Sequence, residues 1–334
     1  MRHVIALDVG GTGMKAALVG ADGKLLHEAR RATARERGPA AVVEAVLDFA
    51  AELRAIGEER FDEPPSAAGI GVPGIVDEAG GVAVYSSNIG WRDVPFRRLL
   101  RRRLSGPLPG ARLSSTRPPA DSRRGRPDLP VAISHDLRAG GLAEARLGAG
   151  RGVDRFLFIA LGTGIAAAIA IDGRIEAGAH GAAGEIGHIV VRRGPDGLPC
   201  GCGQRGCLET LASASAVGRA WGEACGDPEA TAADAAKAVE SGDPRAQAVW
   251  DTAVAALADG LVTGLTLLDP RSLIIGGGLA EAGDTLFAPL REAVRERVTF
   301  QQLPTIVPAA LGDAAGCLGA GLLAWDLLST EVTA

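Results

Sequence analysis

The stretch that decides the fold reads VIALDVGGTGMKAALV and covers residues 4–19. Its first apolar run contains Asp8 near its end, a glycine-rich turn follows, and a second apolar run leads to the pair Asp22-Gly23. Apolar runs separated by glycines and closed by Asp-Gly are typical of a strand, a tight turn, a second strand and a hairpin turn. We therefore predict two strands joined by a glycine turn.

The same order of features recurs far along the chain. Residues 156–171 read FLFIALGTGIAAAIAI, with a Gly-Thr-Gly turn in the middle, and Asp172-Gly173 follows them. A repeat of one supersecondary unit at such a distance indicates two similar α/β halves. We expect these halves to face each other, each offering one glycine turn to the space between them.

Apolar periodicity predicts the other main elements. Helices are expected at 40–55, 137–147, 244–268 and 314–328, and strands at 68–72, 131–133 and 272–275. Residues 105–128 differ from the rest, because they contain five prolines and five arginines and almost no apolar side chains. This composition favours a surface loop, and further arginines between 97 and 103 leave open that it attracts an anionic partner.

Composition narrows the class of protein. The 334 residues suffice for two domains, 47% of them are hydrophobic, and the formal net charge is −5. An acidic chain is not built to cover nucleic acid, because binding to phosphates requires a basic surface. Residues 1–8 contain too short an apolar run for a signal peptide or a spanning helix, so we expect a cytoplasmic protein without a membrane partner.

Glycine turns of this kind can hold phosphates. Backbone N–H groups and a hydroxyl in Gly10-Gly11-Thr12-Gly13 could surround a phosphate, and Asp8 beside them suggests magnesium. One such turn is equally typical of an ordinary hairpin, whereas a second turn at Gly162-Thr163-Gly164 favours a nucleotide in a cleft. A third glycine run at 276–278 would let the backbone pass close to a flat ligand such as adenine.

A compact set of metal-ligand residues follows the second repeat. His188 precedes Cys200, Cys202 and Cys207, which are three of only five cysteines, in a glycine-rich stretch. Three thiolates and one imidazole match a closed, four-coordinate structural zinc site, which leaves no open position for catalysis. Because this spacing is rarely accidental in a cysteine-poor chain, we predict a structural zinc ion.

Two glutamates flank the predicted zinc ligands. Glu185 stands three residues before His188, and Glu209 stands two residues after Cys207. Acids held by a metal loop can accept hydrogen bonds from several hydroxyls of a sugar ring. Without these neighbours, a helix-end or surface charge would be the favoured interpretation of each glutamate.

One aspartate is a candidate base. Asp136 lies where an apolar strand ends and the helix from Leu137 begins. This position suits both N-capping of the helix and a base aimed into a cleft, and the sequence leaves the two roles open. Asn88, in an expected loop before Gly90 and Trp91, can donate to and accept from a hydroxyl.

Together these residues resemble the ROK family (repressors, open reading frames, kinases) over nearly the whole chain, and its bacterial glucokinase-like members in particular. The resemblance rests on Asp8-Val9-Gly10-Gly11-Thr12, Gly71-Val72-Pro73-Gly74, Asn88-Ile89-Gly90-Trp91, Leu161-Gly162-Thr163-Gly164, Gly184-Glu185-Ile186-Gly187-His188 and the run from Cys200 to Glu209. It implies a duplicated actin-like, hexokinase-like (ribonuclease H-like) α/β fold with an active-site cleft between two domains. The implied domains are residues 1–134 with the last helix, about 314–330, and residues 135–313 with the zinc loop.

The resemblance also implies roles for individual residues. Asp136 would be the general base in phosphoryl transfer from ATP, which brings Mg²⁺. The implied sugar-binding residues are Gly74, Asn88, His135, Asp136, Glu185, His188 and Glu209. The implied ATP and phosphate contacts are Asp8, Gly10, Gly11, Thr12, Lys15, Gly162, Thr163, Gly164, Gly276, Gly277 and Gly278. The zinc ligands are His188, Cys200, Cys202 and Cys207, so His188 has two roles.

Two departures from the family pattern bear on the substrate. Family kinases commonly have Asn-Asp where this chain has His135-Asp136, and they usually lack residues 105–128. We expect an ATP-dependent hexose kinase that forms glucose 6-phosphate, as a homodimer or higher homo-oligomer. N-acetylmannosamine or another N-acetylhexosamine, fructose, and polyphosphate as donor stay open.

The alternative of another class is a sugar-sensing transcriptional regulator without catalysis, because the same family includes such proteins. Those regulators carry an N-terminal DNA-binding extension, typically a helix-turn-helix. Here the first expected strand begins at His3 and the chain is acidic, so we favour the kinase.

Overall fold

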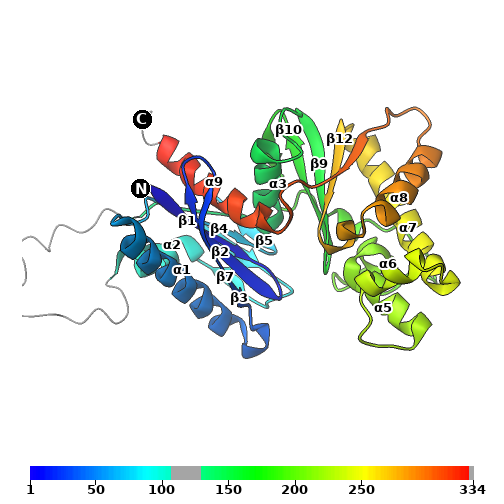
Figure 1. The fold of residues 1–334 in the computed structure, drawn as a ribbon, viewed down its shortest axis with the longest axis horizontal. Helices are drawn as coiled ribbons and strands as arrows, with labels where there is room; N and C mark the ends of the chain where they lie inside the picture. Colours follow the sequence, from blue (N-terminus) through cyan, green and yellow to red (C-terminus); the bar gives the residue numbers. More distant parts are fainter. Residues whose placement is uncertain (107–128, 331–334) are drawn as a thin grey trace, which may run out of the picture. The chain divides into compact units, whose positions relative to one another are not determined.

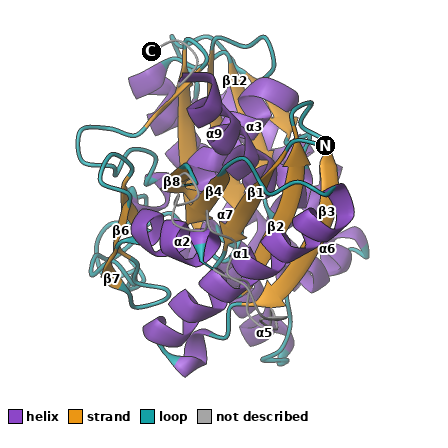
Figure 2. Cartoon of the chain, turned by 90° about the vertical axis from the view of Figure 1, so that its left-hand side faces the viewer, coloured by secondary structure: helices purple, strands orange, loops and turns teal. Residues whose placement is uncertain are grey.

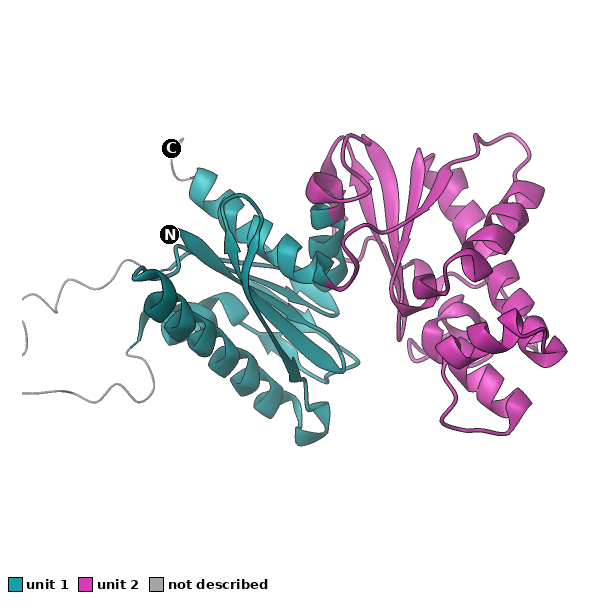
Figure 3. Ribbon diagram, in the orientation of Figure 1, with its two compact units in different colours: residues 1–143, 314–334 teal, residues 144–313 magenta. Residues whose placement is uncertain are grey.

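The computed structural model describes residues 1–106 and 129–330. They form two compact units, unit 1 with residues 1–143 and 314–334 and unit 2 with residues 144–313 (Figure 3). The helix α3 (Asp136–Leu147) begins just after the predicted domain boundary at residue 134 and runs from unit 1 into unit 2. Of the predicted loop at 105–128, all but the first two residues lie outside the described part of the chain.

Unit 1 is built on a five-stranded sheet with the order β3-β2-β1-β4-β8. β2 pairs antiparallel with β1 and β3, whereas β4 pairs parallel with β1 and β8. The strands are β1 (His3–Val9), β2 (Gly13–Gly20), β3 (Leu25–Ala32), β4 (Ala68–Val72) and β8 (Val131–His135). A separate small sheet holds β5 (Ile75–Asp77), β6 (Val82–Tyr85) and β7 (Arg92–Val94).

Unit 2 repeats the five-stranded arrangement in the order β11-β10-β9-β12-β13. The middle strands β10, β9 and β12 are labelled in Figure 1. Its first two pairings are antiparallel and its last two parallel, as in unit 1. The strands are β9 (Arg155–Leu161), β10 (Ile165–Ile171), β11 (Arg174–Glu176), β12 (Ser272–Gly276) and β13 (Thr305–Pro308). The predicted repeat of 4–19 and 156–171 is confirmed, because β1 and β2 correspond to β9 and β10.

Backbone torsions explain the hairpin turns that close both repeats. Between β2 and β3, Gly23 has a φ of 78°, and between β10 and β11, Asp172 and Gly173 have φ values of 51° and 74°. Such positive φ values suit glycine, and among other residues they occur mostly in aspartate and asparagine. The Asp-Gly pairs thus meet the torsional demand of the hairpins, as the sequence predicted.

Helices cover both faces of the unit 1 sheet (Figure 2). Because successive strand residues point to opposite faces, Ile5 and Leu7 of β1 join one buried cluster, while Val4 and Ala6 join another. The first cluster includes side chains of α1 (Pro39–Phe61) and α2 (Phe96–Ser105), and the second includes side chains of α9 (Ala315–Thr330). The predicted helices at 40–55 and 314–328 are confirmed.

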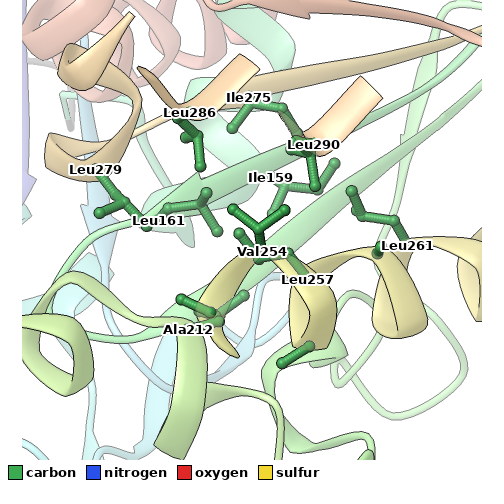
Figure 4. Close-up of a cluster of buried hydrophobic side chains, with 14 of the residues drawn as sticks. Ile159, Leu161, Ala212, Val254, Leu257, Leu261, Ile275, Leu279, Leu286 and Leu290 are labelled. Atoms are coloured by element: carbon green, nitrogen blue, oxygen red, sulfur yellow. The ribbon is translucent and has the colours of Figure 1, made fainter. Parts of the chain in front are cut away.

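The core of unit 2 forms between its sheet and a group of helices (Figure 4). The helices are α4 (Glu209–Ala212), α5 (Ala214–Cys225), α6 (Ala232–Glu240), α7 (Pro244–Leu268) and α8 (Asp284–Arg297). Ile159 and Ile275 of the sheet belong to one buried cluster with Leu257 of α7 and Leu290 of α8. Among the described residues, α7 alone has the length and hydropathy of a membrane span, and half of that stretch is buried within the unit.

Glu144 is a fully buried acid in α3. Its carboxylate accepts hydrogen bonds from the backbone N–H groups of Ala149 (2.8 Å), Ala310 (3.3 Å) and Leu311 (2.9 Å). A buried carboxylate is tolerated when several N–H groups bond to it. Because Ala310 and Leu311 lie in the segment between β13 and α9, Glu144 joins the first and the last segments of unit 2.

Replacing Glu144 by Ala should lower the free energy of unfolding by about 1–3 kcal/mol, because three partly buried N–H groups lose their acceptor. Urea unfolding followed by circular dichroism measures the change. The matched control is Glu296→Ala, at an exposed position of α8, with an expected change below about 0.5 kcal/mol. Equal unfolding midpoints for the two variants would contradict the role assigned to Glu144.

Candidate functional site

The carboxyl ends of three parallel strands form one edge of the unit 1 sheet. In the sheet register, Asp8 of β1 pairs with Gly71 of β4, and Gly71 pairs with Ser134 of β8. Neighbouring strands are about 4.8 Å apart, so the backbones at Asp8 and Ser134 are about 10 Å apart across the sheet. Asp136, which follows β8 directly, therefore lies at the same edge as Asp8.

Gly71 allows the start of α3 to pack directly on β4. A Cβ at position 71 would lie 3.1 Å from Asp136 Cα. This is closer than the 3.5–4.0 Å or so at which carbon atoms normally meet. A larger residue at position 71 would therefore push the start of α3 away from β4 by at least a few tenths of an ångström.

A buried threonine anchors the first glycine turn, between β1 and β2. Gly10 N–H donates to Gly13 O (2.9 Å), and Thr33 donates twice, from Oγ1 to Gly10 O (2.7 Å) and from N–H to Thr12 O (3.0 Å). Sequence analysis did not single out Thr33. The place of Thr33 beside the turn follows only from the sheet register. Gly13 pairs with Ala32, and this pairing brings residue 33 next to the turn.

Other predicted unit 1 residues surround this turn. A Cβ at Gly11 would lie 3.9 Å from Asn88 Cβ, so Asn88 lies beside the turn. Lys15 of β2 pairs with Asp8 of β1, and cross-strand partners place their side chains on the same face. A Cβ at Gly316 of α9 would lie 2.3 Å from Asp8 Oδ2, so the first turn of α9 packs against this carboxylate.

Gly74 lies where two backbone segments of unit 1 approach each other closely. Gly74 has a φ of 97°, and a Cβ there would lie 2.1 Å from Tyr85 O. Only glycine fits this close approach of two backbone segments. Asn88 itself is exposed, in a turn that Gly90 N–H closes by donating to Ser86 O (2.8 Å).

Asp136 is the first residue of α3, and its carboxylate is partly accessible, because 28% of the side chain is exposed. Its Oδ1 accepts a hydrogen bond from Leu137 N–H (2.7 Å) and lies 3.1 Å from His135 Nδ1. Both contacts use Oδ1, and no described residue donates a hydrogen bond to Oδ2. The helix-end role left open by the sequence thus occupies one oxygen and leaves the other accessible to a substrate.

A polar network that sequence analysis missed fixes the start of α3. Glu78 Oε1 accepts hydrogen bonds from Ser134 Oγ (2.7 Å) and Arg138 Nε (3.0 Å). The Arg138 side chain is 4% exposed and the Glu78 side chain 39% exposed, so the guanidinium side of this ion pair is shielded from water. Because Ser134 and Arg138 flank Asp136, the network holds the backbone that carries the candidate base.

The four predicted zinc ligands gather in unit 2. His188 ends the short helix η2 (Ile186–His188), and its ligand atom lies within 4.8 Å of those of Cys200, Cys202 and Cys207. Cys200 Sγ lies 3.6 Å from His188 Nδ1, and Cys202 Sγ lies 3.7 Å from Cys207 Sγ. Sequence reasoning therefore identified all four members of this cluster.

These separations fit tetrahedral coordination. With metal–sulfur bonds of about 2.3 Å and a metal–nitrogen bond of about 2.0 Å, tetrahedral angles place two sulfurs about 3.8 Å apart. The same bonds place a sulfur and a nitrogen about 3.5 Å apart. These two distances are close to the tetrahedral values, and all four ligand atoms lie within 4.8 Å of one another, so the cluster could hold a metal such as zinc.

The pKa values of the cysteines determine whether they are thiolates, which is the form that binds a metal. Burial raises the pKa of Cys207 to about 12 and also raises the pKa of Cys200. A backbone hydrogen bond from Gln204 lowers the pKa of Cys202. Without a metal, Cys207 is therefore a neutral thiol near pH 7. Because thiolate is the coordinating form, metal binding should release protons and weaken as the pH falls.

Of the two predicted sugar-binding glutamates of unit 2, one lies beside His188 and the other beside the second glycine turn. Glu185 Oε2 lies 3.8 Å from His188 Nε2, whereas His188 Nδ1 faces Cys200. Glu209 begins α4, and its Oε2 accepts a hydrogen bond from Ile165 N–H (2.9 Å), directly after the second glycine turn. A Cβ at Gly164 would lie 2.5 Å from Glu209 Oε2, so that turn needs glycine there.

The second glycine turn opens on a cavity of about 990 Å³ within unit 2. Gly162 and Thr163 line it together with Gly278, the first residue of the short helix η3 (Gly278–Ala282). Gly162 O also accepts a hydrogen bond from Ala214 N–H (2.9 Å), so α5 starts on the turn. The structure thus brings Gly162 and Thr163 of the predicted phosphate turn and Gly278 of the predicted adenosine run to one cavity, whereas Gly164 does not line it.

The residues that line this cavity differ in part from the predicted nucleotide contacts. Gly276 and Gly277 are not among its lining residues, and a Cβ at Gly277 would lie 2.6 Å from Leu161 O, so this glycine serves strand packing. The α5 and α6 side of the cavity was not predicted. It contributes Arg219 and Glu223 among others, and Glu281 of η3 also lines the cavity.

A model of the ROK family matches residues 4–109 and 121–326. The chain belongs to the ROK family. It is 33% identical to a glucokinase of Thermotoga maritima, over 95% of each chain. It is 31% identical to a glucokinase of Halalkalibacterium halodurans, over 96% of this chain and 94% of the relative. A ROK family glucokinase of Streptomyces griseus, in complex with glucose and AMPPNP, matches with a TM-score of 0.78 at 28% identity, over 97% of this chain and 99% of that chain.

Membership of the ROK family confirms the recognition made from the sequence motifs, and the fold is the expected actin-like one. In this ROK chain the candidate residues fall into two groups. Unit 1 carries Asp8, Gly10 to Thr12, Lys15, Gly74, Asn88, His135 and Asp136. Unit 2 carries the cluster of His188 and three cysteines, Glu185, Glu209, the turn at 162–164 and the run at 276–278.

Proposed function

We propose that this protein is an ATP-dependent hexose kinase that converts glucose to glucose 6-phosphate. The observation that carries the proposal is the accessible Oδ2 of Asp136 at the strand edge that also bears Asp8 and the first glycine turn. The similarity to glucokinases over nearly the whole chain favours glucose as the acceptor. We also propose that the two units act as the two domains of a cytoplasmic enzyme.

Asp136 acts as the general base in this proposal. Its Oδ2 accepts the proton of the attacking sugar hydroxyl while the hydroxyl oxygen forms a bond to the γ-phosphorus of ATP. The bond from the γ-phosphorus to the bridging oxygen breaks, and ADP leaves. The first glycine turn would position phosphate oxygens with its backbone N–H groups. Asp8 would hold Mg²⁺, which neutralises phosphate charge when bound.

Asp136→Asn should reduce kcat at least about 100-fold, because an amide cannot accept the proton, and it should leave glucose affinity within about threefold. A coupled assay for ADP gives kcat, and isothermal titration gives the glucose Kd. Asp93→Asn, at an exposed residue of β7, is the matched control and should keep wild-type kcat. A fully active Asp136→Asn variant would reject Asp136 as the base.

The sugar-binding residues are proposed in both units. Asn88 of unit 1 and Glu185, His188 and Glu209 of unit 2 offer the amide, carboxylate and imidazole groups that bond to hydroxyls. We propose that the metal is zinc and that its role is structural, because three cysteines and a histidine complete a four-coordinate shell. Zinc then fixes His188, whose Nε2 lies near Glu185.

Cys202→Ser should reduce the zinc content from about one ion per chain to nearly none and weaken glucose binding by about 10- to 100-fold. The physical reason is that the loop carrying Glu185 and His188 loses its anchor. Atomic emission and titration calorimetry measure the two effects. Cys225→Ser, at a cysteine outside the cluster, is the matched control and should retain both zinc and affinity. Unchanged glucose affinity in zinc-free protein would contradict the proposal.

The cavity of unit 2 is proposed to hold the nucleotide. Thr163 and the turn at 162–164 would contact phosphates, and Gly278 would lie beside the adenosine. The carboxylates of Glu223 and Glu281 and the guanidinium of Arg219 line this cavity, whose volume of about 990 Å³ accommodates an adenosine group. ATP is the proposed donor, because the second glycine turn offers a place for phosphates at the same cavity.

Gly278→Leu should raise the KM for ATP at least about tenfold, because the new side chain fills part of the cavity. A Cβ at Gly278 meets no atom within 4 Å, and its φ is not positive, so folding should be unaffected. Coupled kinetics at saturating glucose give the KM, and thermal unfolding checks the fold. Glu296→Leu adds the same side chain outside the cavity and is the control. An unaltered KM for ATP would place the nucleotide elsewhere.

N-acetylmannosamine, another N-acetylhexosamine and fructose are the alternative acceptors, and a sugar-sensing regulator is the alternative function. Values of kcat/KM for these sugars, measured beside glucose, separate the kinases. A regulator would bind sugar and a specific DNA site but transfer no phosphoryl group to any of them.

A further inference from the structure

Arg219 is the only cationic residue among the described residues that line the cavity of about 990 Å³ in unit 2. The carboxylates of Glu223 and Glu281 line the same cavity, and the other lining residues carry no charge. Opposite charges attract more strongly in a partly enclosed space than in open water. Arg219 is therefore the one side chain of this cavity whose charge attracts an anionic ligand.

Helix α5 places Arg219 between the second glycine turn and Glu223. Ala214 N–H, at the start of α5, donates to Gly162 O of the turn (2.9 Å). With a rise of about 1.5 Å per residue, Arg219 lies about 7.5 Å farther along the helix axis than Ala214, and Glu223 lies about 13.5 Å farther. Long side chains on a helix lean toward its N-terminus. The cation of the cavity is therefore nearer to the turn than the carboxylate of Glu223.

A backbone carbonyl of α4 orients the Arg219 guanidinium. Arg219 Nη2 donates to Thr210 O (3.2 Å), and Thr210 follows Glu209, whose Oε2 accepts the N–H of Ile165 directly after the second glycine turn. The contact thus keeps the guanidinium on the side of the turn. Arg219 forms no ion pair with any described carboxylate, although Glu223 lies four positions later on the same helix. A guanidinium has five N–H donors, so those that Thr210 does not use are available to a ligand.

We propose that Arg219 binds the phosphates of the nucleotide in this cavity and thereby directs them toward the second glycine turn. This rests on the proposed function. A guanidinium forms short, charge-assisted hydrogen bonds with phosphate oxygens, often two in parallel. Glu223 repels phosphates by its like charge, so it disfavours the opposite direction of the nucleotide, with the phosphates farther along α5. The arrangement selects phosphorylated nucleotides over the uncharged nucleoside.

Substitutions at position 219 separate charge, geometry and packing. Arg219→Gln removes the charge, whereas Arg219→Lys keeps the charge but loses the planar pair of donors. Arg219 is exposed, and glutamine and lysine are good helix formers, so both variants should fold. Arg295→Gln is the matched control, because Arg295 is an exposed residue of α8 outside the cavity lining.

Isothermal titration of the full chain measures the Kd of ADP and of adenosine. We expect Arg219→Gln to weaken ADP binding by about 10- to 100-fold, through the loss of one or two charge-assisted hydrogen bonds. The Kd of adenosine should change by less than about twofold, because adenosine has no phosphate for Arg219 to bind. Arg219→Lys should recover ADP affinity to within about fivefold of wild type. Arg295→Gln should bind both ligands as wild type does.

The outcomes distinguish this proposal from the proposed function. If Gly278→Leu leaves the Kd of both ligands unchanged, the nucleotide lies elsewhere, and the role of Arg219 fails with the proposed site. If Gly278→Leu weakens both ligands but Arg219→Gln binds ADP as wild type does, only the role of Arg219 is overturned. An equal loss for ADP and adenosine in Arg219→Gln also overturns it, because a distorted cavity explains such a loss.

The kinase activity itself is tested separately. Absence of phosphoryl transfer to any sugar would reject the proposed kinase, whereas a loss specific to ADP in Arg219→Gln would still support phosphate binding by Arg219. Thermal unfolding checks the fold of each variant, and Arg219→Ala replaces Arg219→Gln if the latter does not fold.

Discussion

The close contact between Gly71 and Asp136 is the constraint on which the unit 1 site depends. Parallel pairing in register puts Asp8, Gly71 and Ser134 in one row, and the missing side chain at Gly71 lets α3 start against the sheet. The network of Glu78, Ser134 and Arg138 then fixes the backbone on both sides of Asp136. Sheet register and backbone packing therefore determine where Asp8 and Asp136 lie in unit 1.

The duplicated fold uses the same glycine turn in two different surroundings. In unit 1 the turn is held by the buried hydroxyl of Thr33, and Asp8 and Asn88 lie near it. In unit 2 the turn receives the start of α5, and Glu209 accepts the N–H of Ile165 beside it. The turn of unit 1 therefore lies near an acid and an amide, whereas the turn of unit 2 lines a cavity. This divergence suits a reaction with two different substrates.

The sequence was informative where chemistry is local. The spacing of Cys200, Cys202 and Cys207 predicted that these cysteines gather with His188, and Asp-Gly pairs predicted the hairpins, because residues close in sequence suffice for both. Contacts between distant segments were not predictable. Thr33 meets its turn only through strand pairing, and Glu78 reaches Arg138 across sixty positions of sequence. The cavity wall from α5 and α6 likewise depends on helix packing that no short motif encodes.

Direct observation of phosphoryl transfer tests the central claim. Phosphorus NMR of the protein with ATP, Mg²⁺ and glucose should show a hexose 6-phosphate signal that grows in equal amount to ADP, with no inorganic phosphate beyond a protein-free control. The account predicts this balance because the base acts on a sugar hydroxyl and not on water. Consumption of ATP without a phosphorylated sugar, or no consumption with glucose or any other hexose, would contradict it.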